Sequence, residues 1–359
     1  MSRYLLIDIG AGTMDILYCD SRTKLHYKAV VVSPVRLLAG CVEQLSGDLV
    51  VTGCEMGGGA LTGALRRQAA HARVVMSASA AATIHHDPKR VRAAGIQVVT
   101  DDQADEMVSA GGFRHLVLAD LDAARLETIV EGLGVPFDFD AVAVCAQDHG
   151  RPPQGVSALD FRHHMFRSVL SRSPYPHELL YAPAEIPPAM GRLRALARCA
   201  QKLPAGEVYV MDSGMAAILG ASLDRQAVGW REFTVLDVAT SHTVAAMLEQ
   251  DRLAGFFEYH THDVTLPRLE ALLTQLAQGR LEHQALLAEG GHGAYVRKAL
   301  GIQALQKIIA TGPKRRLLEG SRLPIAWGAP LGDNMMTGAA GLLQALMRRR
   351  GRRIPAVYS

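Results

Sequence analysis

The sequence is poor in aromatic residues, which make up 5% of its 359 positions, so its cores must be built from aliphatic side chains and methionine. It also has no Cys-x-x-Cys motif. The wide spacing of its cysteines argues against zinc ribbons, cysteine-bound iron–sulfur clusters and a dense disulfide framework. Isolated cysteines are typical of a cytoplasmic protein, and we expect that location. The cysteines are Cys19, Cys41, Cys54, Cys145 and Cys199.

Charge and hydrophobic runs exclude two further classes of partner. The formal net charge is only +3, which is too small to favour nucleic acid as the main partner. The basic stretch at residues 348–353 is best explained as a solvated tail. No apolar run approaches the roughly 18 residues that a membrane span needs, and no signal peptide is visible, so we expect no membrane partner.

Short apolar runs alternate with segments of helical spacing along the chain, and this alternation predicts an α/β fold. A proline-rich region at residues 151–188 interrupts the pattern, which then starts again. We therefore predict two domains, residues 1–205 with an inserted subdomain and residues 206–359. The second domain should end in a closing helix at residues 338–349.

One local pattern occurs twice. Residues 5–17 and 234–246 each contain an apolar strand ending in Asp and one apolar residue, a turn of small or hydroxylated residues, and a second strand. Backbone N–H groups in such a turn can approach phosphate oxygens, and the carboxylate can hold Mg²⁺. Two such hairpins facing each other would hold a triphosphate from both sides. The residues assigned to this site are Asp8, Gly10, Gly12, Thr13, Asp237, Thr240, Ser241 and Thr243, with Asp8 and Asp237 as the metal ligands.

The two hairpins resemble those of the actin-like ATPase superfamily, which includes actin, sugar kinases and heat-shock chaperones. Residues 212–220 and 337–341 resemble its two interdomain helices, and residues 308–313 resemble its adenosine-contacting turn, which assigns Gly312 to the nucleotide. The resemblance implies a two-domain α/β, ribonuclease H-like fold that binds ATP with Mg²⁺ in a cleft between the domains. One departure is Ala239, where the superfamily usually has glycine.

A narrower resemblance is to a family some of whose members are labelled pyruvate formate-lyase activating enzyme-related. Such activating enzymes are radical SAM proteins that hold a cluster with a cysteine triplet. This sequence has no such triplet, so we do not expect that activity. The motifs that carry the resemblance are residues 56–60, 147–150, 257–261 and 290–294.

Polar residues that follow a predicted buried strand at residues 141–146 are the candidates for catalysis, because sites in α/β folds often lie just beyond strand ends. Asp148 could act as a base that polarises a water or a substrate hydroxyl, with Gln147 and His149 assisting. The alternative is that Asp148 caps a helix and His149 lies at the surface.

A second pocket for an unknown substrate is expected from glycines and histidines. Consecutive glycines before a predicted helix can hold an anion at its N-terminus, or they can simply form a loop. Several histidines, together with Asp148, could also gather into a transition-metal site, although no spacing among them is diagnostic. The residues assigned to the pocket are Gly57, Gly58, Gly59, His260 and His292.

These assignments favour Mg²⁺-dependent phosphoryl transfer from ATP to a small molecule, or ATP hydrolysis that acts on a protein partner. The sequence does not separate these two activities. A second hypothesis is a catalytically degenerate nucleotide-binding or scaffold protein of the same fold. A third is a metal-dependent hydrolase that uses the histidines.

Overall fold

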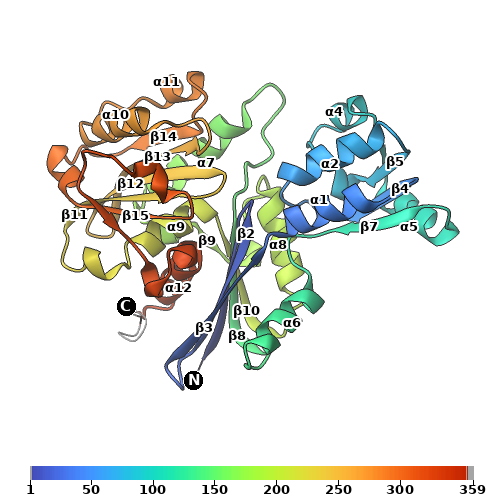
Figure 1. Cartoon of the computed structure of the whole chain (residues 1–359), viewed down its shortest axis with the longest axis horizontal. Helices are drawn as coiled ribbons and strands as arrows, with labels where there is room; N and C mark the ends of the chain where they lie inside the picture. Colours follow the sequence, from blue (N-terminus) through green and yellow to red (C-terminus); the bar gives the residue numbers. More distant parts are fainter. Residues whose placement is uncertain (1, 353, 355–359) are drawn as a thin grey trace.

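The computed structural model describes residues 2–352 and residue 354, which form two six-stranded sheets and one four-stranded sheet with helices packed against them (Figure 1). None of the helices in this part of the chain combines the length and apolar character that a membrane crossing requires.

The first six-stranded sheet contains the first predicted hairpin. Across the sheet the strands are β3 (Leu25–Val32), β2 (Thr13–Asp20), β1 (Arg3–Ile9), β8 (Phe139–Ala146), β10 (Ala205–Met211) and β9 (Leu180–Tyr181). The first three strands form an antiparallel meander, and β1 then pairs in parallel with β8, as β8 does with β10. Continuous apolar sequence in β1 and β8 matches their burial at the centre of the sheet.

Five strands of the second six-stranded sheet repeat this order, and its sixth strand, β14 (Gly293–Val296), lies at the opposite edge from β9 of the first sheet. The strands of the second sheet are, in order, β14, β13 (Arg252–His260), β12 (His242–Glu249), β11 (Glu232–Val238), β15 (Ile308–Thr311) and β16 (Ile325–Trp327). Again three strands form an antiparallel meander, and β11 pairs in parallel with β15, as β15 does with β16. This duplicated strand order is that of the two-domain actin-like α/β fold, so the predicted fold class is confirmed.

The four-stranded sheet lies between β3 and β8 in the sequence and is set apart on one side of the molecule (Figure 1). All its neighbouring strands are parallel, in the order β6 (Gln97–Val99), β5 (Val74–Ser77), β4 (Leu49–Gly53) and β7 (Arg114–Leu118). The helices in this segment of the chain are α1 (Pro34–Gln44), α2 (Gly59–Ala69), α3 (Ala78–Ala81), α4 (Pro88–Ala93) and α5 (Asp101–Ala110).

Two helices, α9 (Ser213–Ala221) and α12 (Thr337–Arg349), pack against each other where the resemblance predicts the interdomain helices. Helix α9 leads from β10 of the first sheet to β11 of the second, and α12 returns from the second sheet to contact β1 and β8. A methyl group on Gly220 would lie 1.7 Å from the Thr337 carbonyl oxygen, and one on Gly341 would lie 1.8 Å from that of Ala216. The helix backbones therefore touch, which only glycine permits.

The passage from the first sheet to the second lies after β10. A boundary after residue 205 falls at the start of β10, whereas β10 pairs with β8 along its length, so membership of the first sheet extends to Met211. The proline-rich region also contains α7 (Ala158–Leu170), which packs against β14 of the second sheet. The other helices are α6 (Ala123–Gly132), α8 (Gly191–Ala200), α10 (Leu266–Ala277) and α11 (His283–Ala288).

Candidate functional site

The turns of the two hairpins meet. A methyl group on Gly12, between β1 and β2, would lie 3.0 Å from the hydroxyl oxygen of Thr240, between β11 and β12. The hairpins have equivalent registers, in which Asp8 pairs with Asp15 and Asp237 pairs with Val244. Two stretches from opposite parts of the sequence thus come face to face.

Carboxylates gather beside these turns. Burial raises the pKa of Asp8 to about 7, and the charges of Asp237 and Asp212 add to the increase. A hydrogen bond from the Cys145 thiol to Asp8 Oδ1, at 3.2 Å, acts in the opposite direction. Burial also raises the pKa of Asp237 to about 6, although the Thr311 hydroxyl donates to its Oδ1 at 2.8 Å. A cation near Asp8 and Asp237 would relieve this accumulation of negative charge.

Asp15 belongs to the same group, and the sequence analysis did not assign it. Its exposed fraction is 6%, and its Oδ1 atom is buried without a hydrogen-bond partner. Burial, followed by the charge of Asp8, raises the pKa of Asp15 to about 8. The signal that could have identified it is its pairing with Asp8 across the hairpin, which puts both side chains on one face of the sheet.

The first turn is closed by its own backbone. The Gly10 amide donates to the Thr13 carbonyl oxygen at 3.0 Å, and the Ser33 hydroxyl donates to the Gly10 carbonyl oxygen at 2.6 Å. The Thr13 hydroxyl is engaged with Asp15. These bonds fix the shape of the turn that carries Gly12.

The residues assigned to the site from the second turn differ in their exposure. Thr240 is exposed at the junction, whereas Thr243 is wholly buried, with its hydroxyl 3.0 Å from that of Thr261. The Ser241 carbonyl oxygen accepts from the Thr261 amide at 2.9 Å. Thr243 therefore stabilises the sheet behind the turn and is not displayed toward the opposite hairpin.

Gly312 lies at the end of β15 and packs directly on the second hairpin. Its φ is 90°, and a methyl group there would lie 2.5 Å from the Val238 carbonyl oxygen. The Asn334 side chain donates to the Gly312 carbonyl oxygen at 3.2 Å. A glycine is required here both by the dihedral angle and by the close approach.

Asp148 has the structural role that was the alternative in the sequence analysis, whereas His149, which that alternative placed at the surface, is partly buried. The Oδ1 atom of Asp148 accepts from the Gly150 amide at 2.7 Å, and its Oδ2 accepts from the Leu193 amide at 2.9 Å, near the start of α8. Its exposed fraction is 3%. Both oxygens are occupied by the backbone, so the interpretation of Asp148 as a base is not carried forward.

Arg192 in α8 is a second residue that the sequence analysis missed. Its guanidinium forms two hydrogen bonds with Asp120, at 2.8 and 3.0 Å, and donates to the Gln147 carbonyl oxygen at 2.8 Å. A methyl group on Gly57 would lie 2.8 Å from Arg192 Nη2. Arg192 thus links residues 147–149 to the glycine loop that runs into α2, namely Gly57, Gly58 and Gly59.

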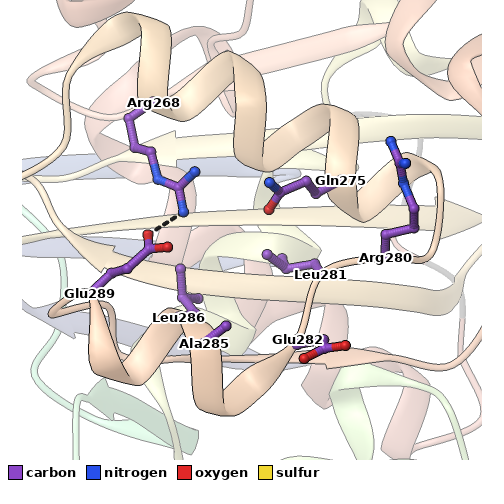
Figure 2. A pocket seen from close by; sticks show the side chains of 8 residues that line it. All are labelled: Arg268, Gln275, Arg280, Leu281, Glu282, Ala285, Leu286 and Glu289. Carbon is purple, nitrogen blue, oxygen red and sulfur yellow. Dashed lines mark hydrogen bonds and ion pairs between the residues drawn. The ribbon is translucent and has the colours of Figure 1, made fainter.

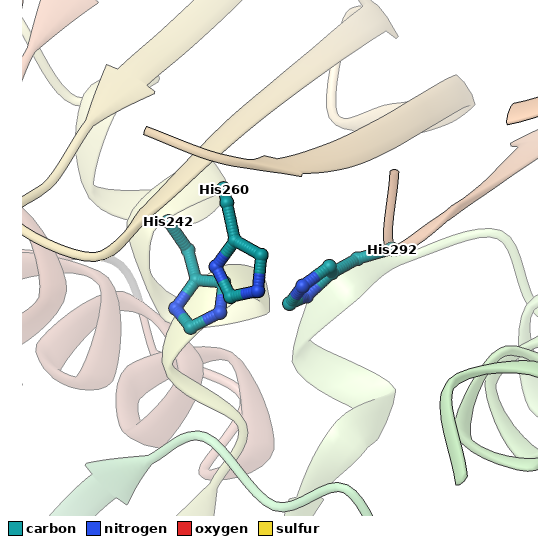
Figure 3. Close-up of side chains that lie close together, drawn as sticks. All are labelled: His242, His260 and His292. Carbon is teal, nitrogen blue, oxygen red and sulfur yellow. The ribbon is translucent and has the colours of Figure 1, made fainter. Parts of the chain in front are cut away.

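Three histidines of the second half of the chain form what we call the histidine cluster: His242, His260 and His292 (Figure 3). One ring nitrogen from each lies within 4.8 Å of those of the other two. His242 and His260 begin and end adjacent strands and are directly paired, and the His292 amide donates to the Glu258 carbonyl oxygen at 2.9 Å. The structure therefore brings the predicted His260 and His292 together and adds His242.

His149 approaches this cluster from the loop after β8. Its ring centroid is 6.0 Å from that of His292 and 6.3 Å from that of His242. Burial lowers the pKa of His149 to about 3, of His242 to about 2 and of His292 to about 4. These rings are therefore uncharged at neutral pH.

A buried ion triad lies beside the histidines. Arg162 of α7 donates through Nη2 to both oxygens of Asp212, at 2.9 and 2.8 Å, and through both terminal nitrogens to Glu258 of β13. All three residues are almost wholly buried. The Arg162 charge, despite burial, holds the pKa of Glu258 at about 2. One positive charge is thus shared by two carboxylates.

A separate cavity of about 370 Å³ lies between α10 and α11 (Figure 2). An ion pair between Arg268 and Glu289 crosses it near one end, and Arg280 stands near the other. None of its lining residues was assigned to a site from the sequence.

The family of the chain follows from a match over residues 56–317 to the model described as "Putative pyruvate format-lyase activating enzyme (DUF1786)". The chain belongs to this family. Among the described residues, the group that could hold a metal ion consists of histidines. No curated protein matches the chain.

Solved structures give distant likenesses over almost the whole chain. The PilM–PilN type IV pilus biogenesis complex matches at 13% identity and a TM-score of 0.40, covering 96% of this chain and 98% of that chain. A ROK hexokinase from Thermus thermophilus matches at 14% identity and 0.32, with coverage of 96% and 98%. A xylulose kinase from Lactobacillus acidophilus matches at 10% identity and 0.30, with coverage of 96% and 90%. The assignment of the fold class rests on the duplicated strand order.

Proposed function

We propose that this protein binds ATP with Mg²⁺ between its two hairpin turns and uses it for phosphoryl transfer or hydrolysis. The observation that carries the proposal is the close approach of two equivalent turns, each preceded by a strand whose penultimate residue is an Asp, the half-buried Asp8 or the buried Asp237. Backbone amides of the turns would bind phosphate oxygens, and the two carboxylates would hold Mg²⁺ or its waters. Gly312 would lie near the adenosine.

Binding requires the turns to separate. A phosphate group between them needs donors about 3 Å away on each side. A single methyl group added to Gly12 would already lie 3.0 Å from the Thr240 hydroxyl oxygen, so no phosphate fits between these two residues in this arrangement. The proposal therefore includes an opening movement that admits the nucleotide and a closure that excludes water.

The acidic residues supply a further reason to expect a cation. Asp8, Asp15 and Asp237 all have raised pKa values because burial penalises their charged forms. A divalent ion would stabilise the ionised carboxylates and would bridge them to the phosphate groups of the nucleotide. We add Asp15 to the residues of this site, because its charge repels that of Asp8 and a cation beside Asp8 would reduce the repulsion.

The test measures the affinity of a fluorescent ATP analogue with and without Mg²⁺. Wild-type protein should bind in a Mg²⁺-dependent way, and Asp8→Ala should abolish that dependence because it removes a metal-binding carboxylate. The matched control is Asp102→Ala, which changes an exposed acid in α5 and should bind like wild type. Unchanged affinity in Asp8→Ala would remove Asp8 from the site, and no binding by wild-type protein would contradict the proposal.

Turnover separates the two activities. A small-molecule kinase should release ADP only when its substrate is present, whereas an ATPase switch should turn over slowly and respond to a protein partner. A candidate substrate region is the glycine loop beside Arg192, because the loop runs into the N-terminus of α2, where backbone N–H groups can hold an anion.

The second candidate function is a scaffold that has kept the fold and lost catalysis. It is favoured by Ala239 and by the narrow space between Gly12 and Thr240, which a single methyl group on Gly12 would fill. Such a protein would show no Mg²⁺-dependent nucleotide binding in the same assay.

A further inference from the structure

We propose that the histidine cluster binds one divalent transition-metal ion of the zinc type through His242, His260 and His292. Three protein ligands would leave a fourth position for water or for an oxygen of a substrate. This site is separate from the proposed Mg²⁺ site, because imidazole nitrogens suit zinc-like ions, whereas Mg²⁺ prefers oxygen ligands.

The backbone holds the three ligands in place. His242 and His260 are partners in the β12–β13 ladder, and His292 is tied to β13 by the hydrogen bond from its amide to Glu258. Tetrahedral zinc sites have metal–nitrogen distances of about 2.0–2.1 Å, which place the donor nitrogens somewhat more than about 3 Å apart. The present spread of 4.8 Å or less can close to this value by small rotations of the side chains.

Unsatisfied ring nitrogens point to a missing ligand. His242 Nε2, His260 Nδ1 and His292 Nδ1 are buried and have no hydrogen-bond partner. Buried polar atoms are almost always paired, so three orphaned nitrogens in one place require an explanation. In Figure 3 the rings of His242 and His260 lie side by side, and His292 points toward them from a neighbouring segment. A shared metal ion would satisfy one nitrogen of each ring.

The surrounding charge favours a cation. Glu258 lies two residues before His260 on β13, and with Asp212 it shares the single positive charge of Arg162. The buried triad therefore sets two carboxyl groups against one guanidinium beside the cluster, and a cation bound nearby would favour the ionised form of both. A metal ion held by three neutral imidazoles would be compensated by these carboxylates without leaving an isolated ion in the interior.

His149 approaches the cluster from the first half of the chain, and we assign it to the side of the ion where the fourth coordination position is open. Its Nδ1 is also buried and unpartnered, but its ring stands farther from His242 and His292 than these two stand from each other, at 6.3 and 6.0 Å against 4.6 Å. We place it as a positioning residue that bonds to the water or substrate oxygen on the metal. A metal here would therefore connect the two halves of the molecule.

The test titrates Co²⁺ and Zn²⁺ into the metal-stripped full-length protein, with visible absorption for Co²⁺ and calorimetry for Zn²⁺. Wild type should bind one equivalent, and Co²⁺ should show the intense visible bands of a tetrahedral site. Each of His242→Ala, His260→Ala and His292→Ala should weaken binding by at least about 100-fold, because loss of a ligand exceeds the effect of losing an outer partner. The control is His71→Ala, which changes an exposed histidine and should leave affinity unchanged.

Two further variants guard against misfolding as an explanation. His292→Asn keeps a polar side chain of similar size and should also lose tight binding, while its circular dichroism stays that of wild type. Wild-type protein that binds neither ion stoichiometrically, or cluster variants that bind like His71→Ala, would overturn the proposal.

His149→Ala tests the open fourth position. It should keep one equivalent of Co²⁺ with less than about a tenfold loss of affinity but a changed spectrum, as expected for a group outside the ligand set. A loss as large as that of His292→Ala would overturn the open position and establish four protein ligands. The titrations contain no nucleotide, and Asp8→Ala should bind Co²⁺ like wild type, so this proposal and the nucleotide proposal can fail separately.

Discussion

At the scale of single residues, the interior of this protein holds ionisable groups that burial pushes toward their neutral forms. Asp8, Asp15 and Asp237 have raised pKa values, and the histidines nearby have lowered ones. The exception is Glu258, whose pKa the Arg162 charge holds at about 2, so this buried pair stays charged. A bound cation would shift the carboxyl groups toward their ionised forms, whereas imidazoles bind a metal in the neutral form that burial already favours.

Asp15→Asn should alter the pH dependence of stability. The folded-state pKa of Asp15, about 8, lies above the ordinary value of 3.8. Its contribution to stability is therefore complete below about pH 4 and is lost as the pH rises to about 8. Chemical denaturation should show that the variant matches wild type near pH 4 and has the larger free energy of unfolding at pH 8.

The difference between the two proteins is the informative quantity, because the buried histidines act with opposite sign: their lowered pKa values cost stability as the pH falls. The matched control is Asp102→Asn, an exposed acid, whose profile should follow that of wild type. Parallel profiles for Asp15→Asn and wild type would show that Asp15 is not held neutral by the fold.

At the scale of elements, the hairpins and the helices between the sheets could be predicted because their signals are local. An apolar run ending in Asp, a turn of small residues and a second run identify β1–β2 and β11–β12, and small residues identify α9 and α12. Helix α7 was missed because it lies in a proline-rich region and because Arg162 and His163 interrupt the apolar residues Phe166 and Leu170 on its buried face. Its packing depends on partners that are distant in the sequence.

Gly341→Ala should strongly destabilise the contact between α9 and α12. The added methyl group would lie 1.8 Å from the Ala216 carbonyl oxygen, so the helices must move apart, at a cost of about 3 kcal/mol or more. The control is Gly132→Ala at the end of α6, where a methyl group meets nothing within 4 Å. That change should be neutral or stabilise by up to about 1 kcal/mol. Thermal unfolding of the two variants measures the difference, and equal melting temperatures would contradict close packing.

At the scale of the whole molecule, the duplicated order of strands was predictable from the repeated hairpin, but the chemistry between the halves was not. The positions of Asp15, Arg192 and His242 depend on strand register and on loops that meet only after folding. Asp148 shows the converse: a pattern typical of a catalytic residue occurs where a carboxylate holds a turn and a helix end. Residue type and strand position could not separate these two roles.

A disulfide across the turns should test the opening movement. The methyl carbon of an alanine at position 12 would lie 3.4 Å from Thr240 Cβ, close to the separation of about 3.5–4.5 Å found in disulfides. Oxidation of the Gly12→Cys, Thr240→Cys double variant should abolish Mg²⁺-dependent binding of the ATP analogue, and reduction should restore it. Wild-type protein treated with the same oxidant controls for its own cysteines, including Cys54 and Cys199, whose sulfurs are 3.8 Å apart. Binding by the oxidised double variant would show that the turns need not part.

Arg162 constrains how such a movement can proceed. Its partner Asp212 follows strand β10 of the first sheet, and its partner Glu258 lies within strand β13 of the second. Sliding of one half past the other would therefore separate these ion pairs in a buried region, where water cannot solvate the charges. We therefore expect the turns to open by a rotation about an axis through this guanidinium, which keeps its contacts with Asp212 and Glu258. Arg162 would then lie on the hinge axis. The displacement of any part of either half during opening would increase with its distance from Arg162.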